Sequence, residues 1–182
     1  KTAAFFPEIS LSFGESLAKH TSFRIGGPAE VMAFPKNPEQ LGLLLNKSAL
    51  LDCKPVILGA GTNVLAPDEG VRGLVICLKD CLDGMELVDD HCLRVLAGVT
   101  MARAAVFAAK NGLSGLEFAH GIPGTVGGGV YMNAGAYGSD ISRVCVSAEV
   151  MDRDGNIRIV SAQELDFFYR HSALEDTGEI VV

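Results

Sequence analysis

Positive charge is scarce in this chain of 182 residues, and the shortage excludes two classes of partner. Lysine and arginine together number 15, against 22 aspartates and glutamates, which gives a formal net charge of -7. Proteins that hold nucleic acid or an anionic membrane surface by charge are normally basic. We therefore expect neither nucleic acid nor a membrane as a partner, and an anionic ligand would have to be held by backbone amides and a few arginines.

The cysteine and histidine patterns that mark metal sites are also missing. The five cysteines are odd in number and form no Cys-x-x-Cys pair, and the four histidines lack His-x3-His spacing. These patterns argue against a disulfide framework, a zinc ribbon and a catalytic metal. No run approaches about 18 uncharged apolar residues, and the first residues do not follow the order of a signal peptide. We expect a cytoplasmic protein without a metal.

The common nucleotide-binding signatures do not occur either. No Gly-x4-Gly-Lys-Ser/Thr sequence is present, and Val64 stands where the Gly-x-Gly at Gly59 would need its third glycine. A Walker or Rossmann site is therefore not expected.

Glycine, in contrast, is concentrated in two places. Seven glycines fall within residues 121–138, and a shorter loop, residues 59–65, directly follows the apolar run 55–58. Glycine costs backbone entropy and adds no packing, so such density indicates that something needs the bare backbone. One explanation is a phosphate or cofactor met by main-chain N–H groups, held by both loops. The alternative is that the glycines only form tight turns and a close helix crossing.

The pattern of apolar and turn residues predicts two lobes, residues 1–75 and 76–182. Residues 1–12 are expected to be a lead-in, with Phe5, Phe6 and Phe13 as docking points. A parallel α/β lobe follows, and then a larger, mainly antiparallel α+β lobe. Strands are expected at 29–35, 55–58, 73–78, 85–88, 92–97, 144–151 and 157–160. Helices are expected at 38–47, 101–111 and 125–132, and a short one after the capping box at Ser161.

The β-branched residues within Glu179–Val182 predict the beginning of a strand. We expect the chain to be a fragment of a longer protein.

Five blocks, taken in order, resemble the UDP-N-acetylenolpyruvoylglucosamine reductase family over residues 20–175. They are His20-Thr-Ser-Phe-Arg-Ile-Gly-Gly-Pro-Ala29, Gly59-Ala-Gly-Thr-Asn-Val-Leu65, Gly115-Leu-Glu-Phe118, the glycine block from Gly121, and Phe168-Tyr-Arg-His-Ser172. The resemblance implies a vanillyl-alcohol-oxidase-type α+β fold with noncovalent FAD between two lobes. It also implies NADPH-driven reduction of the UDP-N-acetylglucosamine enolpyruvate substrate to UDP-N-acetylmuramate, in peptidoglycan precursor synthesis.

The same resemblance, together with the glycine pattern, assigns the candidate site residues. Those expected to bind FAD are Gly59, Ala60, Gly61, Thr62, Asn63, Val64, Leu65, Gly121, Ile122, Pro123, Gly124, Thr125, Gly127, Gly128, Asn133, Ala134, Gly135, Ala136 and Tyr137. The helix beginning near Thr125 is expected to offer its positive end and free amides to the cofactor. Arg170 is the expected catalytic residue, because a fixed guanidinium suits a carboxylate and stabilises negative charge developing on the substrate.

Several assignments stay open at this point. Arg24 either reaches the cofactor or braces the lobe interface, and His120 is either a flavin contact or a structural histidine. Glu117 is expected to be a buried acid with a structural partner, and Tyr169 a packing residue. The family's catalytic serine and glutamate belong to a substrate domain beyond residue 182, absent from this chain. Alternative functions are an FAD-linked oxidase or 2-hydroxy-acid dehydrogenase of the same scaffold, and a noncatalytic flavin-binding module.

Overall fold

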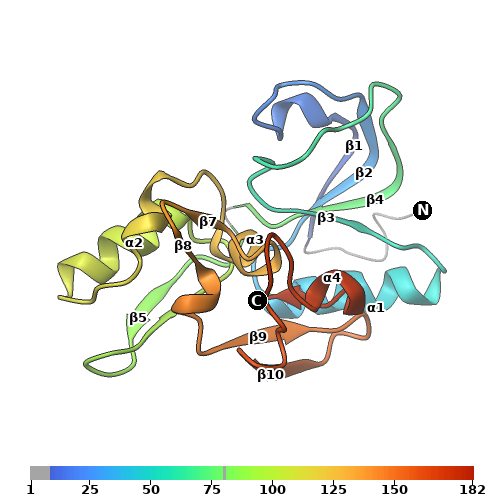
Figure 1. Ribbon diagram of the computed structural model, residues 1–182. Coiled ribbons are helices and arrows are strands. Elements are labelled where there is room, and N and C mark those ends of the chain that lie inside the picture. The colour runs from blue at the N-terminus through green and yellow to red at the C-terminus, as the bar shows by residue number, and fades with distance from the viewer. Residues whose placement is uncertain (1–8, 80) are drawn as a thin grey trace. The chain divides into compact units, whose positions relative to one another are not determined.

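The computed structural model describes residues 9–79 and 81–182, and the chain folds as two compact units (Figure 1). Unit 1 lies within residues 1–81 and unit 2 within residues 82–182. The boundary expected at residue 75 falls inside strand β4, Val71–Cys77, which belongs to unit 1.

Unit 1 is built on a four-stranded sheet in the order β1-β2-β4-β3. Its other strands are β1 (Ser10–Ser16), β2 (Pro28–Phe34) and β3 (Val56–Leu58). β4 pairs in parallel with both β2 and β3, whereas β1 pairs antiparallel with β2. The predicted parallel β-α-β unit is therefore present, with the later strand β4 inserted between its two strands.

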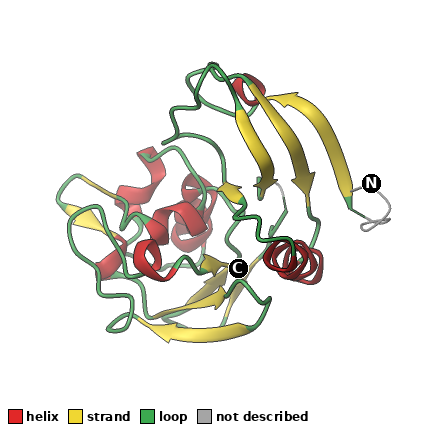
Figure 2. Cartoon of the chain, turned by 90° about the vertical axis from the view of Figure 1, so that its right-hand side faces the viewer, coloured by secondary structure: helices red, strands yellow, loops and turns green. Residues whose placement is uncertain are grey.

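Helix α1, Pro38–Leu50, makes the crossover between β2 and β3 and begins where the sequence predicts. The side chain of Asn37 accepts a hydrogen bond from the Gln40 N–H at 2.9 Å, and Pro38 fills the first helical position, where no N–H is needed. The buried residues of α1 are Leu41, Leu44, Leu45 and Ser48. Figure 2 shows the helix nearly along its axis, next to the strands of unit 1.

Strand β1 corrects the expectation for the first residues. Residues 10–12 belong to a seven-residue strand and not to a lead-in, and Phe13 is 61% exposed, so it docks nothing within the described chain. Phe5 and Phe6 lie outside the described residues. The polar, glycine-containing sequence of β1 hid the strand, because an edge strand needs only partial burial.

Unit 2 begins with a hairpin of β5 (Met85–Leu87) and β6 (Leu93–Val95), which lie within the predicted strands 85–88 and 92–97. Helix α2, Met101–Lys110, follows, with the Thr100 hydroxyl accepting from the Arg103 N–H and Gly112 in the left-handed region just after its end. After the 3-10 turn η3 (Glu117–Gly121) come the short helix α3 (Val126–Tyr131), the two-residue strands β7 (Gly135–Ala136) and β8 (Ser139–Asp140), and η4 (Ile141–Arg143).

A second sheet, in the order β10-β9-β11, completes unit 2. Strands β9 (Ser147–Met151), β10 (Ile157–Ser161) and β11 (Ile180–Val181) all pair antiparallel, which confirms the predicted character of this part. The turn between β9 and β10 is closed by the carboxylate of Asp152, which accepts from the Asp154 and Asn156 N–H groups. The Asn156 side chain also donates through Nδ2 to Asp152 Oδ2 at 2.9 Å, and this bond, followed by those from the N–H groups, holds the pKa of Asp152 below its ordinary value.

The helix expected after Ser161 does not form. The capping box itself is present, since the Glu164 carboxylate accepts from the Ser161 N–H at 2.9 Å and the Ser161 hydroxyl accepts from the Glu164 N–H at 3.3 Å. Only turns follow, and Asp166 adopts a left-handed backbone with φ 43°. The only later helix among the described residues is α4, Leu174–Thr177, which ends at left-handed Gly178.

Candidate functional site

The first glycine loop, residues 59–65, follows β3 in unit 1 and is held by the segment that starts at His20. Gly61 has φ 65°, and a Cβ built there would stand 1.9 Å from the His20 carbonyl oxygen. The Gly61 carbonyl accepts a hydrogen bond from the Ser22 N–H at 2.9 Å. Gly61 is therefore required by the packing of the protein's own backbone, whether or not a ligand binds.

The end of this loop faces solvent. Asn63, Val64 and Leu65 are exposed, with Leu65 at 76%. Among the described residues, no hydrogen-bond acceptor pairs with the N–H groups of Ala60, Gly61 and Asn63. Unpaired N–H groups in a glycine loop at a strand end fit a phosphate-bearing cofactor, because they donate to an anion without side chains in between.

Two side chains anchor the neighbouring segment. The buried Thr21 hydroxyl donates to the Ile25 carbonyl at 2.9 Å, and His20 Nε2 lies 3.0 Å from Glu15 Oε1. The hydrogen bond with His20, and secondarily the charge of Lys19, holds the pKa of the Glu15 carboxyl below its ordinary value. Arg24 is exposed and has a left-handed backbone, with φ 56°.

In unit 2, helix α3 begins directly after its cap residue Thr125, close to where the sequence predicts, but it offers fewer free N–H groups than expected. The Val126 N–H donates to the Val99 carbonyl at 2.8 Å, and the Gly127 N–H donates to the Ala97 carbonyl at 2.9 Å. The Gly128 nitrogen lies 3.5 Å from the Thr125 hydroxyl oxygen, and this distance is at the outer limit of a hydrogen bond. The expectation of several free amides at this helix start is therefore wrong for Val126 and Gly127.

The glycines of this segment divide into two groups by what surrounds them. Cβ atoms added to Gly127, Gly129 and Gly135 would stand 2.8 Å from Ala97 Cβ, 2.7 Å from Met101 Sδ and 2.6 Å from the Ser139 carbonyl oxygen. Cβ atoms at Gly121 and Gly128 would meet nothing closer than 3.6 Å. The alternative explanation, close packing within the chain, thus accounts for the first group. Gly121 and Gly128 remain exposed positions where the bare backbone faces outward.

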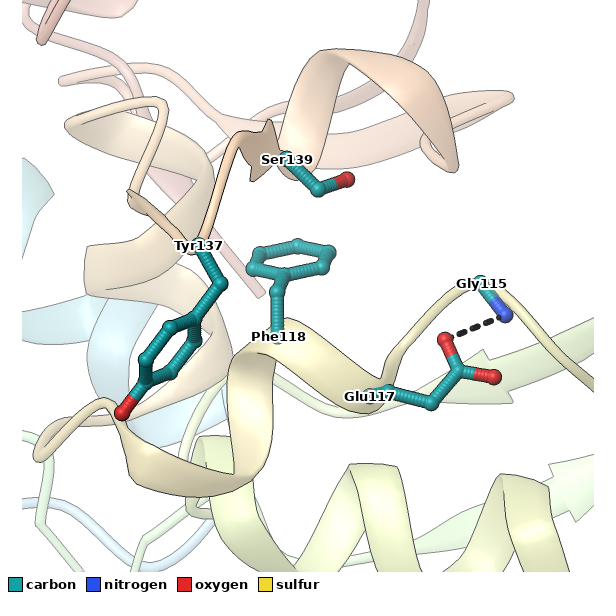
Figure 3. A pocket seen from close by; sticks show the side chains of 5 residues that line it. All are labelled: Gly115, Glu117, Phe118, Tyr137 and Ser139. Atoms are coloured by element: carbon teal, nitrogen blue, oxygen red, sulfur yellow. Dashed lines mark hydrogen bonds between the residues drawn. The ribbon is translucent and has the colours of Figure 1, made fainter.

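Next to this segment, unit 2 contains an open pocket of about 410 Å³ (Figure 3). It is lined by Gly115, Glu117, Phe118, Tyr137 and Ser139. The ring of Phe118 lies between Tyr137 and Ser139, and the carboxylate of Glu117 accepts from the Gly115 N–H at 2.9 Å. Glu117 has the structural partner expected of it, but it is exposed and not buried.

Tyr137 stands out among the candidate residues around the pocket. Its side chain is 91% exposed and its backbone is left-handed, with φ 54°. A large aromatic residue in the left-handed region is strained, and such strain gathers at functional sites.

Arg170 also has a left-handed backbone, with φ 57°, and lies at the tip of a two-residue turn. Phe168 and His171 exchange both backbone hydrogen bonds at 3.2 Å across this turn. The Arg170 guanidinium donates through Nη2 to the Gly135 carbonyl at 2.9 Å, so the structure brings the predicted catalytic residue onto the second glycine segment. Tyr169 is 85% exposed, with the guanidinium 5.6 Å from its ring centre, so the predicted packing role is wrong within the described chain.

Sequence reasoning missed the contacts that hold this turn. The ring of His171 stacks on Phe168 with centres 4.0 Å apart, and its Nδ1 lies 2.7 Å from Glu175 Oε2. The Tyr169-Arg170 pair contains none of the glycine, proline or asparagine residues that mark turns, so no local signal could have located it.

Within residues 9–79 and 81–182, no group of three or more His, Cys, Asp and Glu side chains could hold a metal ion. None of the helices described there has both the length and the apolar character to cross a bilayer.

The sequence and the fold together define the class of this protein. The family described as FAD binding domain matches residues 29–161, and the chain belongs to that family. Its fold is of the vanillyl-alcohol-oxidase type, as the sequence predicts, and FAD is the cofactor that defines the family.

Within this class, the chain is similar to UDP-N-acetylenolpyruvoylglucosamine reductases. It is 43% identical over 176 residues to the reductase of Lactococcus lactis, which covers 97% of this chain and 58% of the relative. It is 45% identical over 161 residues to that of Bacillus subtilis, covering 88% of this chain and 53% of the relative. The chain thus spans less than three fifths of the length of these relatives.

A solved structure supports the same similarity. The crystal structure of UDP-N-acetylenolpyruvylglucosamine reductase from Thermus caldophilus is 32% identical and superposes with a TM-score of 0.73. The match covers 96% of this chain and 59% of that structure.

Proposed function

We propose that this chain is the FAD-binding part of a UDP-N-acetylenolpyruvoylglucosamine reductase. The complete enzyme would use NADPH to reduce the enolpyruvyl ether of a UDP-sugar substrate to UDP-N-acetylmuramate, for peptidoglycan synthesis. The observation that carries this proposal is the identity of more than 40% to two reductases of that name across 88% or more of the chain. The cytoplasm is the proposed location, with neither nucleic acid nor a membrane as partner.

The proposed FAD contacts keep the residues predicted from the sequence, with the structure suggesting how they would act. Residues 59–65 would hold the pyrophosphate, with the unpaired N–H groups of Ala60 and Asn63 as donors. In residues 121–128, the open backbone at Gly121 and Gly128 is the part that suits close approach of the cofactor. Residues 133–137 would complete the site through their main chain and the exposed ring of Tyr137. FAD, when bound, supplies the hydride chemistry, and the protein holds and orients it.

Arg170 is the proposed catalytic residue of this part of the enzyme. Its guanidinium has one fixed hydrogen bond, to the Gly135 carbonyl, and the side chain is otherwise exposed, which leaves donors for a carboxylate. A guanidinium binds a carboxylate through two parallel hydrogen bonds and stabilises negative charge that develops nearby. We propose that it binds the enolpyruvyl carboxylate. No residue of this chain is proposed as the proton donor.

Titration of the purified protein with FAD tests the first half of the proposal. The protein should become yellow, and its absorption spectrum should show saturable binding of one FAD per chain. NADPH, rather than an organic hydroxy acid, should bleach the flavin of the complete enzyme, which distinguishes a reductase from an oxidase of the same scaffold. Failure to retain FAD after gentle refolding would count against the proposal.

A companion substitution tests Arg170 in the complete enzyme. Arg170→Gln should leave FAD binding within about threefold and lower turnover by a factor on the order of 10² to 10³, the usual cost of losing a donor to developing charge. Arg170→Lys keeps the charge but not the paired geometry, so its turnover should lie between those of the parent enzyme and Arg170→Gln. Unchanged turnover in Arg170→Gln would contradict the assignment.

A further inference from the structure

Asn133 is a buried polar residue whose side chain joins two segments of unit 2. It is 4% exposed and has a left-handed backbone, with φ 42°. Its Nδ2 donates to the Phe168 carbonyl at 2.9 Å, and its Oδ1 accepts from the Ser142 N–H at 3.0 Å. Only this orientation of the amide places a donor at the carbonyl and an acceptor at the N–H group.

The partner of Nδ2 is the backbone that carries the predicted catalytic residue. The Phe168 carbonyl is also the acceptor that closes the turn, from the His171 N–H. Arg170, at the tip of this turn, adopts the left-handed region, which is unfavourable for a residue with a Cβ, so surrounding contacts must hold it there. The bond from Asn133 is one such contact, and it acts on the first residue of the turn.

Two other contacts join the same two segments. The Ser172 hydroxyl, fully buried, donates to the Tyr131 carbonyl at 2.7 Å, and Arg170 Nη2 donates to the Gly135 carbonyl. The segment Tyr131–Gly135 therefore contacts the segment Phe168–Ser172 at three points, with Asn133 in the middle. Buried hydrogen bonds of this kind are costly to leave unmade, so the two segments should open and close together.

We propose that Asn133 is a positioning residue that fixes the Arg170 turn on the glycine-rich segment, so that a ligand bound to that segment stabilises the geometry of Arg170. The effect of a bound ligand on Arg170 rests on the proposed function. The link from the Asn133 side chain to the Arg170 turn, called the clamp below, does not. In this proposal, the Asn133 side chain serves the turn, and contact with a ligand at this position is made by the main chain.

Hydrogen exchange of the Phe168 and His171 amides, without any cofactor, tests the clamp. Asn133→Asp keeps the acceptor for Ser142 but places a carboxylate against the Phe168 carbonyl, so both amides should exchange at least tenfold faster. Asn133→Gly removes both bonds without backbone strain at positive φ and should show the same acceleration if Asn133→Asp fails to fold. Asn111→Asp is the control, because it removes a similar bond, from Nδ2 to the Phe107 carbonyl at 2.8 Å, at the end of α2.

Exchange rates of Phe168 and His171 within twofold of the parent protein in either folded variant would overturn the proposal. The second measurement is the reduction potential of bound FAD, which a nearby fixed guanidinium raises by favouring the reduced, more negative flavin. Asn133→Gly, which adds no charge, should lower the potential by at least half of the shift caused by Arg170→Gln, and Asn111→Asp should leave it unchanged. A parent-like potential in Asn133→Gly would overturn the link to Arg170. If the parent protein binds no FAD, the proposed function fails while the exchange experiment still decides the clamp.

Discussion

The two glycine-rich regions of this molecule use glycine differently. In the loop 59–65, Gly61 contacts the His20 carbonyl, while Asn63, Val64 and Leu65 are exposed and the Asn63 N–H has no acceptor among the described residues. In α3, Gly127 and Gly129 pack on Ala97 and Met101, and two of the three first helical amides already have carbonyl partners. Glycine density alone therefore does not locate a phosphate site. The informative feature is a backbone N–H group that has no acceptor within the protein.

The largest effect that we expect is at Gly61. Gly61→Ala would place a Cβ against the His20 carbonyl and force a non-glycine residue to φ 65°, so unfolding free energy should fall by about 3 kcal/mol or more. Urea denaturation measures this change. Gly138→Ala is the matched control, because φ is 81° there but nothing lies within 4 Å, and it should cost only about 1 kcal/mol. Equal losses at the two positions would show that packing on His20 is unimportant.

A smaller effect, of opposite sign at adjacent residues, is expected in α3. Gly127→Ala puts a Cβ 2.8 Å from Ala97 Cβ and should cost roughly 1 to 3 kcal/mol through overpacking. Gly128→Ala meets only the Thr125 hydroxyl at 3.6 Å and should stabilise the protein by about 0.5 to 1 kcal/mol, since alanine favours a helix. Thermal denaturation compares the two variants. If Gly128→Ala also weakens FAD binding, the open backbone there belongs to the cofactor site.

The smallest effect concerns the sheet of unit 2 and depends on pH. Arg158 binds Glu179 through two hydrogen bonds of 2.7 Å, which hold the pKa of this carboxyl below its ordinary value. Because folding lowers this pKa, the stabilisation is full above about pH 4.5 and is lost as the pH falls through the lower folded-state value.

Glu179→Gln should therefore cost about 0.5 kcal/mol at pH 7, a value reduced by solvent screening, and progressively less as the pH falls below 4.5. Urea denaturation at pH 7 and at pH 3 checks this, and an equal loss at the two pH values would mean that packing and not charge is responsible. Asp90→Asn, on the exposed turn between β5 and β6, is a control for the change of charge alone.

Local signals in the sequence were sufficient for most elements of the fold. Asn37 and Thr100 each accept a capping hydrogen bond where a helix is predicted to begin, because a cap depends only on residues within one turn. The capping box at Ser161 shows the limit of such signals. Its two hydrogen bonds form, yet no helix follows, because the next residues bury Leu165 and then reverse at Asp166.

Pairing between distant segments was not predictable in the same way. The sequence indicates parallel strands around α1, but the insertion of β4 between β2 and β3 depends on pairing with residues 42 or 43 positions away in β2 and 19 positions away in β3. Likewise, Arg170 is identified by its motif, but its bond to Gly135 and the bond from Asn133 to Phe168 each link positions 35 residues apart.

The amino-acid sequence by itself determined the helix starts, the main turns, the character of the two units and the family resemblance, because these depend on short-range spacing and residue type. Tertiary structure decided which glycines are needed by the chain's own packing, which backbone amides stay open, and how the Arg170 turn is held. Those properties arise only when distant segments compete for the same space and the same hydrogen-bonding groups.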